Sequence, residues 1–208
     1  MVKLALILVC IYTHITCASE IPFIESNLHM SGNFGVASSP RIINNIDSEV
    51  IDMEVDGNVN YYSWEIGYRL NAFLSMDYSF FETGYYKGKS INENTRYKLR
   101  IVGRGAGLYI RLPIAFRNFK YIVEPTAYIG GGKVNIVDNP KFYNRSGSYY
   151  YGIGYGINIW LNKYLSFRFQ AKIYNFSTYY KKKIQQEDFD FGLPSSVFVR
   201  TVGISIAY

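Results

Sequence analysis

Apolar and polar residues alternate along most of the chain beyond residue 18. In 165–173, for example, every second residue is apolar, and the residues between are Ser, Arg, Gln and Lys. A period of two is typical of strands that have two different faces. No segment has convincing helical periodicity. Eight stretches show the alternation, namely 28–37, 59–70, 72–84, 97–113, 119–137, 148–161, 164–176 and 196–208.

The connections between these stretches alternate in length. The chain turns within a few residues near Asn71, at 114–118 and at 162–163. The other connections are long and polar, and we expect four long loops there, at 38–58, 85–96, 138–147 and 177–195. Short turns at one end and long loops at the other predict an up-and-down meander of eight antiparallel strands. Closure of that meander into a barrel would remove its exposed edges.

The alternation alone does not say which face lies inside the barrel. In a soluble lipocalin-type barrel the apolar face points inward, around a ligand. In a membrane barrel the polar face points inward. Turning the polar face to lipid would expose Glu65, Asp77, Glu124 and Arg168 at a cost of up to about 2 to 4 kcal/mol each, less for the acids. We therefore predict an all-β fold, an eight-stranded antiparallel up-and-down transmembrane β-barrel with its apolar face outside.

The first residues are typical of a secretory signal peptide. A basic start at 1–3 precedes a compact apolar run at 4–11 and small residues at 16–18. We predict a signal peptide at 1–18 and an outer-membrane β-barrel domain at 19–208. Both cysteines, Cys10 and Cys17, fall in the removed segment, so the mature chain would carry no disulfide and no Cys-ligated metal. A lipoprotein processed at Cys17 is the less favoured alternative.

Composition excludes several classes of protein. A length of 208 residues suits one domain. An aromatic content of 18% excludes a disordered chain, and the lack of any run of 18 apolar residues excludes a bundle of membrane-spanning helices. The net charge is +6, but the two signs are interspersed along the sequence, so we expect no nucleic-acid partner.

Seven charged residues belong to the polar faces and should lie inside the barrel. They could form an ion path, or they could fill the lumen as a satisfied buried network. We favour the network, because eight strands leave room only for side chains. Within it we expect Arg168 to have Asp77 or Glu124 as neighbours. The predicted interior network consists of Glu65, Arg69, Asp77, Arg111, Glu124, Arg168 and Lys172.

Three motifs in the strands carry a family resemblance. They are residues 61–78, residues 107–113 followed by 123–131, and residues 202–208 at the end of the chain. Together they resemble the small eight-stranded outer-membrane barrels of Gram-negative bacteria, of the OmpA transmembrane, OmpX/Ail and opacity-protein type. This resemblance implies a location in the outer membrane. It also implies an assembly signal that the barrel assembly machinery reads, formed by Val202, Ile204, Ile206 and Tyr208.

We expect a monomer. The resemblance implies a surface protein that serves envelope integrity, adhesion to a host or matrix receptor, or both. A narrow porin-like channel is an alternative, and a lipid A-modifying enzyme is the least favoured one. We predict no catalytic site, cofactor or metal. The only histidine beyond residue 18 is His29, at the start of the first strand and so at the predicted periplasmic end. The outer-leaflet level of the barrel therefore lacks the histidine base that acyl chemistry there would need.

Two outward bases interrupt the apolar stripe. Arg104 lies eight residues before Leu112, and Arg200 lies eight residues before Tyr208. Eight residues of a tilted strand climb about 20 Å, so both side chains should reach the outer surface of the membrane. We predict that they, with Arg100, contact lipopolysaccharide phosphates. The alternative is snorkelling to water without a specific partner.

The signal peptide and the location can be tested together. We expect the protein to be recovered in the outer-membrane fraction with a mature amino terminus near Ser19, because cleavage is predicted after Ala18. Cell fractionation followed by amino-terminal sequencing measures both. Recovery of the protein in the soluble periplasm would contradict the predicted location.

Overall fold

The structure, a computed structural model, describes most of the chain from Asn27 onward. The described residues are 27–38, 42–46, 49–90, 96–115, 121–138, 148–184 and 187–208. The predicted signal peptide and, apart from Asp138, the predicted loop at 138–147 lie outside them. No helix long and apolar enough to cross a membrane occurs among the described residues.

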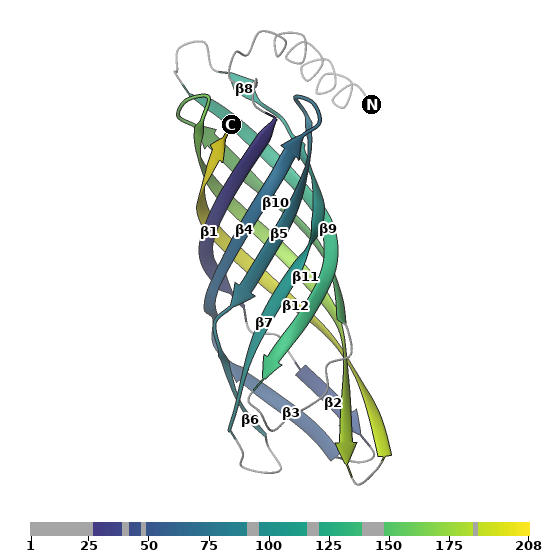
Figure 1. Cartoon of the computed structure of the whole chain (residues 1–208). Coiled ribbons are helices and arrows are strands. Elements are labelled where there is room, and N and C mark those ends of the chain that lie inside the picture. The colour runs from purple at the N-terminus through teal and green to yellow at the C-terminus, as the bar shows by residue number, and fades with distance from the viewer. Residues whose placement is uncertain are drawn as a thin grey trace, which may run out of the picture.

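The central feature is a closed barrel of eight strands (Figure 1). The order around it is β7-β5-β4-β1-β12-β11-β10-β9, and the pairing of β7 with β9 closes it. Every pairing is antiparallel, as predicted. The barrel strands are β1 (Leu28–Ala37), β4 (Val59–Arg69), β5 (Leu74–Thr83), β7 (Arg96–Arg111), β9 (Ile122–Asp138), β10 (Ser148–Trp160), β11 (Leu165–Ile184) and β12 (Glu187–Ala207).

Two of the short turns share one sequence pattern, Leu-Asn-any-aromatic-Leu. In the turn between β4 and β5, the side-chain oxygen of Asn71 accepts hydrogen bonds from the backbone N–H groups of Phe73 and Leu74, both at 2.8 Å. In the turn between β10 and β11, Asn162 does the same for Tyr164 and Leu165, at 2.8 and 2.9 Å. In both tight connections an asparagine side chain thus mimics a backbone turn. Both connections lie at the end of the barrel where β1 begins and β12 ends.

The opposite end differs from the prediction, because segments expected as loops contain strands. The segment 38–58 holds β2 (Ile42–Ile46) and β3 (Glu49–Asp56), and β6 (Tyr86–Ser90) lies in 85–96. The hairpin of β11 and β12 stays paired as far as Ile184 and Glu187, through the segment 177–195. Strand pairing therefore extends well past the barrel, because a polar segment that still carries β-branched and aromatic residues can form a two-stranded ribbon. One further short strand, β8 (Ile114–Ala115), pairs with the start of β9.

The two faces of the barrel are divided as predicted. Along β4, buried and exposed residues alternate without interruption from Tyr61 to Arg69. Large apolar side chains such as Trp64, Tyr78 and Tyr155 are exposed on the outside, 66%, 53% and 70% respectively. Such a continuous apolar exterior on a closed barrel is the surface that a lipid bilayer covers.

Replacement of Asn71 by Ala should destabilise the barrel by about 1 to 2 kcal/mol, since two backbone N–H groups lose their common acceptor. Urea unfolding in lipid vesicles measures the loss. Asn71→Asp is the control, because the carboxylate keeps the acceptor and should retain most of the stability. Equal unfolding free energies for Asn71→Ala and the natural protein would show that the turn contributes nothing.

Candidate functional site

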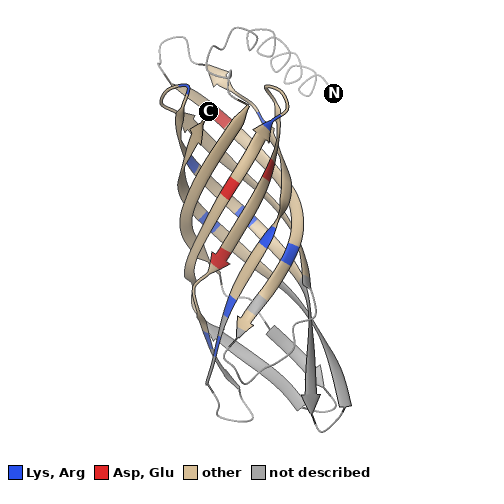
Figure 2. Cartoon of the chain, viewed as in Figure 1, with Lys and Arg blue, Asp and Glu red and all other residues tan. Residues whose placement is uncertain are grey.

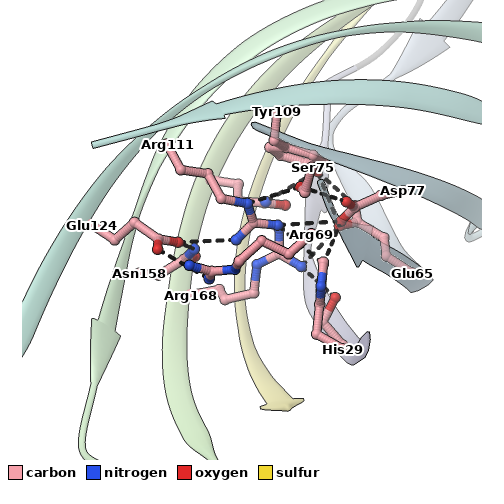
Figure 3. A network of polar contacts seen from close by, with 12 residues as sticks. His29, Glu65, Arg69, Ser75, Asp77, Tyr109, Arg111, Glu124, Asn158 and Arg168 are labelled. Carbon is pink, nitrogen blue, oxygen red and sulfur yellow. Dashed lines mark hydrogen bonds and ion pairs between the residues drawn. The ribbon is translucent and has the colours of Figure 1, made fainter. Parts of the chain in front are cut away.

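Apart from a small apolar cluster of Ile122, Trp160 and Ala207 at the turn end, the barrel interior is divided into two layers. Toward the turns it holds a network of ionised and polar side chains, and toward the far end it holds a cluster of aromatic and aliphatic side chains. All seven residues of the predicted interior network are present in the polar layer, and none is more than 5% exposed. Figure 3 shows how side chains from different strands converge there.

Glu65 on β4 is the most heavily bonded acid of the network. Its two carboxylate oxygens accept from Lys172 Nζ at 2.5 Å and from an Arg168 guanidinium nitrogen at 2.9 Å. The hydroxyl of Tyr109 donates to the same carboxylate, at 3.0 and 3.1 Å. Arg168 also donates to the hydroxyl of Ser31 on β1. The ion-pair partner of Arg168 is thus Glu65, which reaches it across the barrel interior. Asp77 is a charged neighbour of Arg168, as expected, but its own bonds are to other side chains. Glu124 pairs instead with Arg69 and Arg111.

Glu124 on β9 is the second centre of the network. It accepts from Arg111 at 2.9 Å, from Arg69 at 3.1 Å and from the amide of Asn158 at 2.8 Å. These donors come from three different strands, β7, β4 and β10. A carboxylate that is fully enclosed needs such a set of donors, because an unpaired buried charge is strongly destabilising.

Asp77 on β5 forms the third centre, and it brings in His29. The Nε2 atom of His29 lies 2.9 Å from Asp77 Oδ2 and 3.0 Å from a guanidinium nitrogen of Arg111. Ser75 completes the arrangement, because its hydroxyl donates to Asp77 at 2.8 Å and accepts from Arg111 at 2.8 Å. His29 lies at the start of the first strand, as predicted, but the sequence indicated no partner for it. Its side chain belongs to the network.

Tyr109 joins the two layers. Its ring lies between three cations, the side chains of Arg111, Arg168 and Lys172, each 5.3 to 5.4 Å from the ring centre. The ring also packs against that of Tyr128, with a distance of 4.9 Å between ring centres. A tyrosine at this point satisfies the polar layer with its hydroxyl and the apolar layer with its ring.

The aromatic layer beyond Tyr128 was not predicted. Phe81 and Tyr174 stack at 4.8 Å between ring centres, and Tyr150 packs edge-on against both. Rings of this size fit because glycines on neighbouring strands leave them space. A methyl group added to Gly103 would collide with the ring of Phe81. The interior glycines of the alternating pattern are therefore the signal that could have revealed inward aromatic residues.

The aromatic layer ends at Tyr86 on β6. The hydroxyl of Tyr86 donates to the backbone carbonyl of Ser38 at 3.0 Å, just after the end of β1. Burial raises the pKa of the Tyr86 phenol above its usual value, so the group remains a neutral donor. No group of three or more His, Cys, Asp or Glu side chains in the described part of the chain is placed to hold a metal ion.

The three outward bases are not brought together. Arg104 and Arg200 are exposed, but β7 and β12 lie on opposite sides of the barrel, four strands apart in either direction. Arg100 is half-buried beside Glu82, at 3.5 Å, and over the ring of Tyr85. Arg104 and Arg200 therefore cannot hold the same lipid head group. The residues of the predicted assembly signal form the last part of β12 and the end of the chain, with Val202, Ile204, Ile206 and Tyr208 all exposed on the outside.

Solved structures with the same architecture exist, although no protein-family model and no curated protein matches the sequence. The outer membrane protein AlkL matches 88% of this chain over 90% of its own length, with a TM-score of 0.59 and 12% identity. The chain has the fold of the small eight-stranded outer-membrane barrels. OprG, an outer membrane protein from Pseudomonas aeruginosa, matches with a TM-score of 0.53 and 11% identity, over 88% of this chain and 96% of OprG.

A third small barrel, Neisserial surface protein A, matches 87% of this chain over 97% of its own length, with a TM-score of 0.51 and 10% identity. At such identities the likeness is one of fold. The outer-membrane barrel fold and the apolar exterior of this chain agree with the predicted location in the outer membrane.

Replacement of Arg168 by Ala should destabilise the outer-membrane barrel by about 3 to 5 kcal/mol, because Glu65 would lose a buried partner. The matched control is Arg100→Ala, which breaks an Arg–Glu pair that is about one-third exposed and should cost about 0 to 1 kcal/mol. Unfolding by urea in vesicles measures both variants. Similar losses in the two would show that the interior network is not a buried, interdependent unit.

Proposed function

We propose that this chain is a structural, surface-exposed protein of the outer membrane, with a closed interior, that contributes to envelope integrity. Its short turns, the start of β1 and the end of β12 face the periplasm. The strand extensions of β6, β7, β11 and β12 face the outside of the cell. In this role the protein neither conducts solutes nor catalyses a reaction.

The observation that supports this proposal is the filling of the interior by two successive layers. Glu65, Arg111 and Arg168 are 1% exposed in the polar layer, and Tyr61 and Phe81 are 1% exposed in the aromatic layer. Ion pairs of the polar layer cross the barrel interior, between Arg69 and Glu124 and from Arg168 and Lys172 to Glu65 (Figure 3). A solute would have to break these ion pairs and then displace stacked rings. The narrow porin-like channel is therefore disfavoured.

The enzyme alternative lacks a suitable site among the described side chains. His29 is enclosed between Asp77 and Arg111 near the turn end of the barrel, away from the predicted outer leaflet. Ser75 donates its hydroxyl hydrogen to Asp77 and not to His29, so it is not positioned as an activated nucleophile. Adhesion to a host or matrix receptor stays a prediction of the resemblance.

The purified barrel should show no steady conductance in planar bilayers, because both interior layers block the axis. A large porin reconstituted in the same way serves as the positive control for the bilayer. Uniform, long-lived channels from the natural protein would contradict the closed interior and favour the porin-like alternative.

A further inference from the structure

The outward face of the barrel changes from apolar to polar on three neighbouring strands, β5, β7 and β9. Counting away from the turns, the apolar series on β5 ends at Phe80, and Glu82 follows. The series on β7 ends at Ala106 and is followed by Arg104. On β9 the small residue Gly131 is followed by Lys133. These changes mark the edge of the apolar band, which is the level of lipid head groups.

Two of the residues at this edge are bases placed directly opposite each other. Arg104 on β7 and Lys133 on β9 are register partners, and both are exposed on the outside. Figure 2 shows basic positions side by side on these two strands. Neither side chain has an ion pair or side-chain hydrogen bond with any residue that the structure describes. Like charges directly opposite each other destabilise a sheet, and an anion between Arg104 and Lys133 would relieve this repulsion.

The surroundings of the pair have a specific shape. In the same row across the sheet, Phe80 lies opposite Arg104 and Tyr149 lies opposite Lys133. In the next outward row toward the turns, Ala106 lies opposite Gly131. That small pair is flanked by two exposed aromatic side chains, Tyr78 on β5 and Tyr151 on β10. The two bases therefore lie next to a pair of small residues, Ala106 and Gly131, that has a tyrosine on each side.

We propose that Arg104 and Lys133 together bind the phosphate of a lipid head group, whose apolar part lies on Ala106 and Gly131. A guanidinium binds phosphate oxygens in two-pronged fashion, and an ammonium adds a compact charge beside it. The bases lie at the edge of the apolar band, and Ala106 and Gly131 lie beside them within that band. This arrangement favours a lipid over a free anion. Arg200, on the opposite side, has no base opposite it and lies over the ring of Phe198.

This inference rests on the membrane placement in the proposed function but not on the closed interior. A barrel that conducts ions would still have the lipid site at Arg104 and Lys133, and a barrel that does not conduct need not bind lipid there. The lipid experiment and the conductance experiment therefore fail independently.

The test compares lipid binding by the natural barrel and by the double variant Arg104→Gln/Lys133→Gln, using native mass spectrometry in neutral detergent. The probe is bisphosphorylated lipid A, with the same glycolipid lacking both phosphates as reference. We expect the double variant to bind the phosphorylated lipid about tenfold more weakly or worse. The natural protein should show the same loss with the dephosphorylated lipid. Both substituted positions face outward, so the folded barrel should still form, which mobility in an unheated gel checks.

The matched control is Lys87→Gln/Lys98→Gln. It removes two charges from a different pair of exposed, directly opposed bases, which lies on β6 and β7 beyond the barrel. It should bind lipid A as the natural protein does. Equal binding by the Arg104/Lys133 variant and the natural protein overturns the proposal, as does an equal loss in the control variant. Inorganic phosphate alone is the last arm, and binding that is as tight as that of lipid A would assign the pair to free anions instead.

Discussion

The interior of an eight-stranded barrel is wide enough only for side chains, and this constraint governs both layers of the structure. In the polar layer every acid is shared among several donors, as Glu65 is among Lys172, Arg168 and Tyr109. In the aromatic layer the rings fit only because neighbouring strands carry glycine, as Gly103 does beneath Phe81. The polar network, the glycines and the absence of a solute path proposed above are consequences of the same narrow space.

Alternation along the chain was sufficient to predict much of this fold. It identified eight strands, gave the bounds of β1 as the structure has them, and assigned Trp64 and Tyr155 to the outside. It also selected the seven charges of the interior, because a charge on the polar face of a membrane barrel must point inward. All of this depends on the period of two, which a single strand displays by itself.

The features that alternation missed depend on which strands meet. The pairing of Arg168 with Glu65 and the inclusion of His29 follow from contacts across the barrel axis, which no local pattern encodes. The opposition of Arg104 and Lys133 follows from the closure of β7 onto β9. The strands in 38–58 and 177–195 differ from the prediction for another reason. The polar composition of these segments indicates loops, but they also contain β-forming residues.

The repeated Leu-Asn-any-aromatic-Leu turn gives the barrel an approximate two-fold axis. The β4–β5 and β10–β11 hairpins lie diametrically opposite, and counting from Asn71 and Asn162 makes Arg69 equivalent to Trp160 and Asp77 equivalent to Arg168. Arg69 lies over the ring of Trp160, so equivalent positions meet at the axis. A barrel made of two identical halves would set arginine against arginine and aspartate against aspartate. A single chain escapes this restriction, because it can give each symmetry-related position a complementary partner.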